Sequence, residues 1–301
     1  MAIMNEMTLN ETLTMRPVHR LVAATRTLEG GGFPVRRPLP TAVLPDMDPF
    51  LLLDHLGPVA WGPGEGIGAP AHPHRGFETV TYLISGAMEH EDSFGRRGSL
   101  GPGDVQWMTA GSGLVHSELP SAEFMRDGGV MHGFQIWVNL PARVKMIAPH
   151  YQEIPAARIP EAVSADGRVK VKVVAGEAMG QRAVIATRTP IMFLHYTLQP
   201  GAVVSEAIPA DYRVLAYAFS GDAVVGIDSI PLPEGTAAVF GAGAAIALGG
   251  GTDKEAHVLV LAGVPINEPV ARYGPFVMNR QEELAQAFKD YQSGRMGSLG
   301  Q

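Results

Sequence analysis

Short runs of β-branched and aromatic residues recur along this 301-residue chain, and glycine or proline bounds most of them. Residues 79–85 (TVTYLIS) lie between Gly76 and Gly86, and residues 105–109 (VQWMT) follow a Pro-Gly turn. Glycine and proline number 36 and 24, whereas only 18% of the residues are charged. This composition fits many short strands joined by tight turns better than it fits long helices. The sequence therefore predicts an all-β protein.

The same texture occurs in both halves of the chain. Residues 141–160 contain four prolines and little periodicity, so we expect a boundary there, with one domain at residues 1–145 and another at 146–301. So many short strands allow two antiparallel domains, each a sandwich or a barrel. Further strands are expected at residues 49–55, 134–138, 169–173, 193–198, 214–219, 236–240 and 257–262.

One short helix is predicted near the C-terminus. Asn279 can cap its first turn, Glu282 lies three residues further on as in a capping box, and Gly294 suits its end. Its apolar face would consist of Leu284, Ala287, Phe288 and Tyr291.

Composition excludes several classes of protein. A net charge of −7 argues against a general nucleic-acid surface. The chain has no cysteine, which removes disulfides, Cys-based zinc sites and thiol nucleophiles. No apolar run approaches the roughly 18 residues that cross a bilayer, and residues 1–17 lack the basic start and apolar block of a secretory signal. We expect a cytoplasmic protein that binds neither nucleic acid nor membrane.

Two pairs of metal-binding residue types stand at a strand's spacing in the first half. His72 and His74 form one pair, and His116 and Glu118 form the other. Residues i and i+2 of a strand point to the same face, so two such strands facing each other inside a barrel would bring three nitrogens and one carboxylate together. Pro73 keeps the first pair at a strand start or edge. The spacing therefore predicts a metal site.

The ligand types limit the metal without identifying it. Imidazole and carboxylate suit iron, nickel, copper, manganese or zinc, and iron as Fe(II) is our first choice. An octahedral ion with four protein ligands keeps positions free for O2 and a chelating substrate oxygen. A divalent ion with one carboxylate favours an anionic enolate or catecholate over a neutral ligand. The alternative is a tetrahedral, non-catalytic zinc with the same four ligands.

A weak internal repeat suggests that the site is single. Residues 72–86 (HPHRGFETVTYLISG) can be laid over residues 207–221 (AIPADYRVLAYAFSG). Tyr82 then coincides with Tyr217, and the closing Ser-Gly of both segments coincides as well. Ala207 and Pro209 stand at the two histidine positions. If the halves are duplicates, only the first kept the chemistry.

Other polar residues have less specific interpretations. Arg36 and Arg37 could form a solvated edge or the lip of a pocket, and we favour the solvated edge. Residues 90–92 (HED) read as an exposed hairpin tip. The turn Gly111-Ser112-Gly113 would aim His116. Lone strand histidines are interpreted as hydrogen-bonded structural residues: His132, His195 and His257.

The histidine segments resemble a known family. Gly66-x5-His72-x-His74-x3-Glu78, followed by Gly86, resembles the first cupin motif, and residues 102–118 (PGDVQWMTAGSGLVHSE) are close to the signature of the pirin family. The resemblance spans nearly the whole chain. Further segments that carry it are residues 29–40 (EGGGFPVRRPLP), 48–58 (DPFLLLDHLGP), 149–160 (PHYQEIPAARIP) and 274–279 (GPFVMN).

The resemblance implies a bicupin of two jelly-roll barrels in tandem, with one mononuclear iron in the N-terminal barrel. The family's ligands fall on His72, His74, His116 and Glu118, and none is missing. Glu78 is a ligand in many other cupins but not in pirins, so it is expected beside the site. Some pirins are similar in activity to quercetin 2,3-dioxygenases, whereas others resemble regulators that bind transcription factors or metabolic enzymes.

Three hypotheses follow. The first is a dioxygenase that opens a flavonol-like ring with O2, in which Glu118 takes the proton of the substrate hydroxyl. The second is a non-enzymatic, iron-dependent regulator with a protein partner. The third is a cupin that zinc stabilises. We favour the first.

Overall fold

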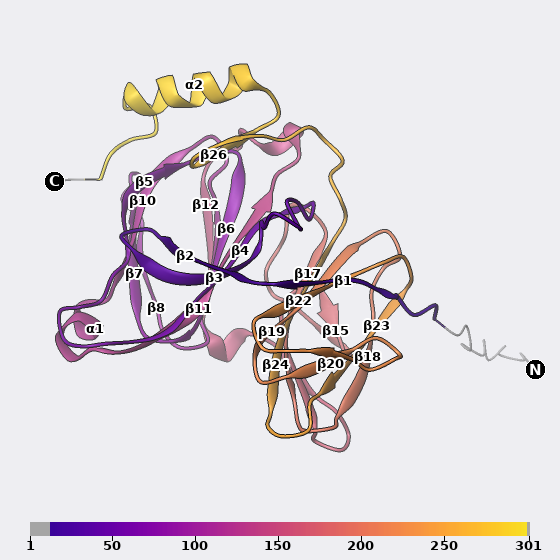
Figure 1. Cartoon of the computed structure of the whole chain (residues 1–301). Coiled ribbons are helices and arrows are strands. Elements are labelled where there is room, and N and C mark those ends of the chain that lie inside the picture. The colour runs from indigo at the N-terminus through magenta and orange to yellow at the C-terminus, as the bar shows by residue number, and fades with distance from the viewer. Residues whose placement is uncertain (1–12, 300–301) are drawn as a thin grey trace, which may run out of the picture.

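Two antiparallel β barrels lie side by side in the structure, a computed structural model that describes residues 13–299 (Figure 1). Each barrel pairs a seven-stranded sheet with a four-stranded one. In spatial order, the large sheet of the first barrel contains β12 (His150–Ile154), β9 (Val105–Thr109), β6 (Phe77–Ser85), β11 (Gly129–Asn139), β4 (Phe50–Trp61), β3 (Phe33–Leu39) and β2 (Thr25–Glu29). Its small sheet contains β5 (Ala69–His74), β10 (Leu114–Pro120), β7 (Met88–Asp92) and β8 (Arg97–Leu100).

The second barrel repeats this plan. Its large sheet contains β1 (Val18–Ala23), β22 (Thr236–Phe240), β19 (Arg213–Ser220), β24 (Ala256–Gly263), β17 (Ile191–Leu198), β14 (Val169–Ala175) and β13 (Glu161–Val163). Its small sheet contains β18 (Val203–Ala207), β23 (Ala245–Gly250), β20 (Ala223–Val225) and β21 (Ile230–Leu232). Two short hairpins complete the strands: β15 (Glu177–Ala178) with β16 (Gln181–Arg182), and β25 (Ala271–Tyr273) with β26 (Phe276–Met278).

The main core lies between the two seven-stranded sheets. Strand alternation explains this arrangement: along β6, Val80 and Tyr82 face the other barrel, whereas Thr79 and Thr81 face the interior of their own barrel. The residues that meet at this interface include Trp107, Phe134 and Ile136 from the first barrel and Phe193, Phe219 and Leu259 from the second. A residue of these strands that alternates with the interface residues therefore faces the interior of the first barrel.

Helices are few in the described part of the chain. α1 (Ala122–Asp127) begins where the Ser121 hydroxyl accepts a hydrogen bond from the backbone N–H of Phe124, and α2 (Gln281–Gln292) is the longer helix. Single 3-10 turns span Ala142–Val144 and Ala156–Arg158.

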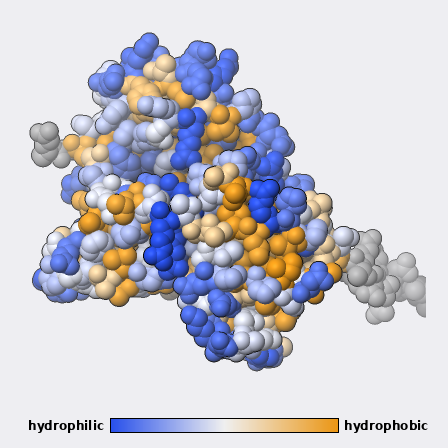
Figure 2. Space-filling view, viewed as in Figure 1, coloured by the Kyte–Doolittle hydropathy of each residue, from blue (hydrophilic) through white to orange (hydrophobic). Residues whose placement is uncertain are grey.

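The predicted cap of the C-terminal helix was one residue out of place. Arg280 is the N-cap of α2, and its backbone N–H donates to Glu283, not to Glu282. The Asn279 side chain instead donates to Pro269 O at 2.8 Å and so anchors the preceding loop. The exposed edge of α2 is largely hydrophilic, with hydrophobic residues beneath it (Figure 2).

The prediction of an all-β fold with tandem jelly-roll barrels and a short C-terminal helix is confirmed. The boundary between residues 1–145 and 146–301 stays a prediction, and residues 1–12 and 300–301 lie outside the described part. Strand pairing crosses this boundary in both directions, since β1 pairs with β22 and β12 pairs with β9. Residues 141–160 therefore do more than link the two barrels, because β12 within them is a strand of the first barrel.

None of the described helices has the length and apolar character that a membrane crossing requires.

Candidate metal centre

The paired strands β5 and β10 bring three histidines together. In their register, His116 lies opposite His72. The Nε2 atom of His72 lies 3.0 Å from Nε2 of His74 and 3.0 Å from Nε2 of His116. One ligand atom from each of the three residues lies within 4.8 Å of the others, which is a group that could hold a metal ion. The predicted convergence of the three imidazoles is therefore present.

The surroundings of these rings fit a metal. His72 Nδ1 lies 2.8 Å from Pro70 O, and His74 Nδ1 lies 3.4 Å from Pro275 O. A backbone carbonyl can only accept, so these contacts place the ring proton on Nδ1 and leave the Nε2 lone pair free. Lone pairs that face one another at 3.0 Å need a proton or a cation between them. The donor set therefore fits a divalent ion.

Burial keeps two of the rings neutral. His116 is fully buried and His74 is 4% exposed. Burial first, and then the neighbouring histidines, lowers the pKa of His74 and of His116 well below its usual value. Neutral imidazole is the form that binds metals, so these rings need no proton release near neutral pH.

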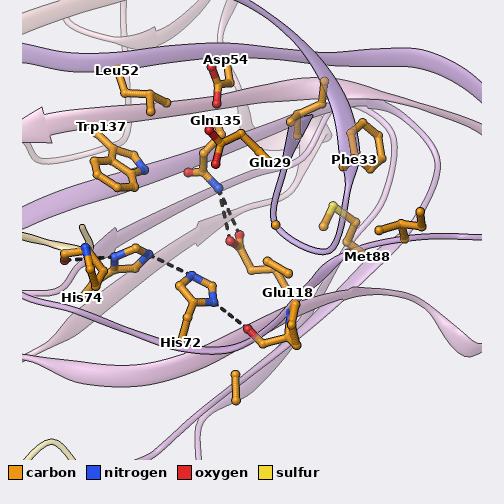
Figure 3. A pocket seen from close by; sticks show the side chains of 18 of the residues that line it. Glu29, Phe33, Leu52, Asp54, His72, His74, Met88, Glu118, Gln135 and Trp137 are labelled. Carbon is orange, nitrogen blue, oxygen red and sulfur yellow. Dashed lines mark hydrogen bonds between the residues drawn. The ribbon is translucent and has the colours of Figure 1, made fainter. Parts of the chain in front are cut away.

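Glu118 lies beside the histidines but outside their cluster. Its Oε1 accepts a hydrogen bond from Thr81 Oγ1 at 2.8 Å, and its Oε2 accepts one from Gln135 Nε2 at 3.2 Å. Figure 3 shows the carboxylate turned toward Gln135, across from His72. The three histidines are close enough together to hold a metal ion, and the Glu118 carboxylate does not belong to that cluster. Its role as fourth ligand and as base stays a prediction.

A cavity of about 480 Å³ opens beside this centre, a size common for small-molecule sites. His72, His74 and Glu118 line one end, and Trp137 stands over His74 with the ring centroids 5.3 Å apart (Figure 3). Apolar side chains make up much of the remaining wall: Phe33, Leu52, Leu56, Ile67, Met88 and Met131. The cavity therefore offers an apolar, partly aromatic surface next to the histidines.

A charged group forms another part of the wall. Arg37 donates to Asp54 from Nε at 2.6 Å and from Nη2 at 2.5 Å, and it also contacts Glu29. The guanidinium of Arg272 lies 4.7 Å from the centre of the Trp137 ring. The expectation of a solvated edge is wrong for Arg37, because pairing with Asp54 holds its side chain in the wall of the pocket.

Two further expectations are corrected. Glu78 does not lie beside the site, because alternation along β6 puts it on the face of Val80 and Tyr82, where it accepts from Thr109 Oγ1 at 2.6 Å. His90 is not at an exposed hairpin tip: it lies in β7, only 4% exposed, 2.6 Å from Glu153. The Tyr151 ring stacks on it, with the ring centroids 5.0 Å apart.

The other strand histidines are hydrogen-bonded, as expected. His195 contacts Tyr82 at 2.8 Å and His257 at 3.1 Å, and His132 lies 2.8 Å from His55.

Sequence reasoning missed Gln135 and Trp137. Both belong to the inward face of β11, two residues apart in an otherwise apolar run. A glutamine at such a position is the signal that could have found them, because a polar residue facing a barrel interior needs a partner.

Among the residues that the structure describes, the second barrel has no comparable centre. Its strands β18 and β23 pair as β5 and β10 do, with Ala207 opposite Ala245. Buried apolar side chains fill most of its interior, and the Tyr196 hydroxyl donates to the buried Glu206 there. Within residues 13–299, a cluster of three or more side chains that could hold a metal ion occurs only in the first barrel.

Comparison with known families agrees with this architecture. Residues 32–138 match the family model Pirin, and residues 193–297 match the Pirin C-terminal cupin domain. The chain belongs to the pirin family. Its two barrels are the tandem cupin domains of that family.

Relatives align over almost their full length. A pirin-like protein of Solanum lycopersicum is 42% identical over 94% of this chain and 93% of its own length, and pirin of Homo sapiens is 42% identical over 89% and 90%. Among solved structures, quercetin 2,3-dioxygenase from Acinetobacter baumannii is similar with a TM-score of 0.89 and 35% identity, covering 95% of this chain and all of that one.

Proposed function

We propose that the chain is a mononuclear metal dioxygenase that acts on a flavonol-like substrate, with Fe(II) as the metal. His72, His74, His116 and Glu118 would hold the ion. The observation that carries the proposal is the convergence of three Nε2 atoms at the end of a cavity that an acid and an aromatic ring also line. The similarity to a structure named quercetin 2,3-dioxygenase supports the substrate class.

The metal would supply a Lewis-acid centre and, as iron, electron exchange with O2. The donor set would also accept zinc, nickel, copper or manganese, since imidazole and carboxylate suit all of them. Elemental analysis of the native protein therefore identifies the bound metal.

The residues of the chain would provide binding, orientation and proton transfer. The apolar wall and Trp137 would hold a flat aromatic molecule and exclude water from it. Glu118 would accept the proton of a substrate hydroxyl. Thr81 and Gln135 would keep its carboxylate aimed into the cavity, because both donate hydrogen bonds to it.

Metal analysis combined with oxygen uptake tests this function. Native protein is expected to carry mostly iron, to change its absorption spectrum when quercetin is added without oxygen, and to consume O2 once air is admitted. Removal of the iron by a chelator should stop the uptake, and added Fe(II) should restore it. Iron-loaded protein that shows neither the spectral change nor oxygen uptake would overturn the proposal and favour an iron-dependent regulator. Protein that carries mostly zinc would favour a structural role for the metal.

A further inference from the structure

The last part of the chain returns to the first barrel. After the second barrel ends, residues 271–299 lie against the strands that carry the histidines, with α2 at the outer surface (Figure 1). A small apolar core joins this C-terminal segment to β10. It consists of Val115 from β10 with Ala271, Phe276, Met278, Leu284, Ala287 and Met296 from the segment.

The segment contributes directly to the candidate metal centre. Pro275 O lies 3.4 Å from His74 Nδ1, and Gly274, Pro275 and Arg272 line the cavity. The backbone N–H of Val277 donates to Arg75 O at 3.0 Å, directly after His74. The acceptor that orients the His74 ring is therefore distant in sequence and belongs to the C-terminal segment.

A buried ion pair holds the segment in place. Arg75 Nη1 lies 2.8 Å from Asp290 Oδ2 in α2, and the two residues are 5% and 8% exposed. Arg75 Nε also donates to Ser112 O at 2.7 Å, in the turn before the strand of His116. One guanidinium thus connects α2 with the backbone next to His74 and with the turn that leads to His116.

A second buried cation connects the same parts. Lys145, 2% exposed, donates from Nζ to Gly76 O at 2.8 Å and to Val277 O at 3.2 Å. The backbones approach so closely that a Cβ on Gly76 would lie 1.9 Å from Val277 O, and Gly76 has a φ of +90°. Glycine is required here for both reasons. The contact is specific in geometry, not a general apolar docking.

We infer that the C-terminal segment is a positioning element of the metal centre and that the Arg75–Asp290 pair couples its docking to metal binding. This inference rests on the proposed metal site. When the segment is docked, Pro275 O accepts from His74 Nδ1, and the segment completes the cavity wall. Undocking of the segment would remove both. Because such coupling is reciprocal, a bound ion must in turn stabilise the docked segment.

Hydrogen exchange on the unaltered protein tests the reciprocal effect. Metal-free full-length chain is compared with chain saturated with Co(II), an ion whose visible absorption reports its coordination. Exchange within residues 271–299 should slow on Co(II) binding, whereas exchange in β18 and β23 of the second barrel should not change. If Co(II) binds and residues 271–299 exchange at the same rate as before, the coupling is wrong. If the chain binds no Co(II), the metal site itself is wrong and the coupling falls with it.

Substitution of Asp290 tests the positioning role. Asp290→Asn should weaken Co(II) binding by up to the roughly 10- to 100-fold that follows loss of a ligand's own hydrogen-bond partner, because it frees the segment that carries Pro275 O, and should alter the Co(II) spectrum. Asp290→Glu, which restores the charge, should recover much of the affinity. Glu282→Gln, an exposed change on the same helix, is the matched control and should leave both unchanged.

The outcomes separate the two proposals. Wild-type affinity and spectrum in Asp290→Asn would overturn the coupling while leaving the metal site intact. If Asp290→Asn does not fold, the exchange experiment on the unaltered chain decides.

Discussion

Replacement of His116 by alanine is expected to abolish metal binding and turnover. His116 is fully buried in β10, and its Nε2 lies 3.0 Å from that of His72. The change removes one of three converging nitrogens, so the loss of affinity should exceed the roughly 10- to 100-fold that follows removal of an outer partner. Metal content by elemental analysis and metal-dependent O2 uptake are the measurements.

His195→Ala is the matched control for this experiment. His195 is also a buried strand histidine, 7% exposed, but it lies at the interface between the barrels and contacts Tyr82 and His257. Both variants lose a buried imidazole, so both should lose about 1–3 kcal/mol of stability in the metal-free form. Only His116→Ala should lose the metal. Bound iron and turnover that survive in His116→Ala would show that the centre is elsewhere.

Strand alternation explains how much of the centre the sequence could predict. His72, Pro73 and His74 stand on a short edge strand, and the i,i+2 rule alone places both imidazoles on one face. The rule also placed Glu118 with His116, but it does not say where a flexible carboxylate points. Hydrogen bonds from Thr81 and Gln135, on strands distant in sequence, decide that.

The missing parts depend on long-range contacts. Arg37 meets Asp54, and Arg75 meets Asp290 across 215 residues. No local pattern indicates such partners, because each residue alone is compatible with a solvated surface. The return of residues 271–299 to the first barrel is likewise invisible to periodicity. Repeats and turn residues predict two barrels, but they do not predict which barrel the chain ends against.

Acid should weaken the interface between the barrels, where four histidines surround Phe219. Contacts cross the interface in both directions: His55 Nδ1 lies 3.1 Å from Tyr217 OH, and Tyr82 OH lies 2.8 Å from His195 Nδ1. The charged groups that act on the histidines here are Arg36, Lys172, Glu234 and Glu255.

The direction of the pH effect follows from the lowered pKa values. Burial first, and then His132 and Arg36, lowers the pKa of His55 from 6.5 to about 2, and burial with Arg36 and His257 lowers that of His132 to about 4. The unfolded chain therefore binds more protons than the folded chain below pH 6.5. Stability is fully present above this pH and is lost as the pH falls toward the folded values. For His55 alone the loss at about pH 4.5 is about 3 kcal/mol.

Urea unfolding of the metal-free protein between about pH 7 and pH 4.5 measures this loss. The quantity to compare is the slope of the unfolding free energy against pH, because a constant destabilisation by a substitution cancels from it. His55→Gln should reduce the slope by up to about 1.4 kcal/mol per pH unit, the value of one proton. His150→Gln, at an exposed histidine, should leave it unchanged. His74 and His116 contribute with the same sign in every variant, so they cancel from the comparison. An unchanged slope in His55→Gln would show that His55 does not carry the acid sensitivity.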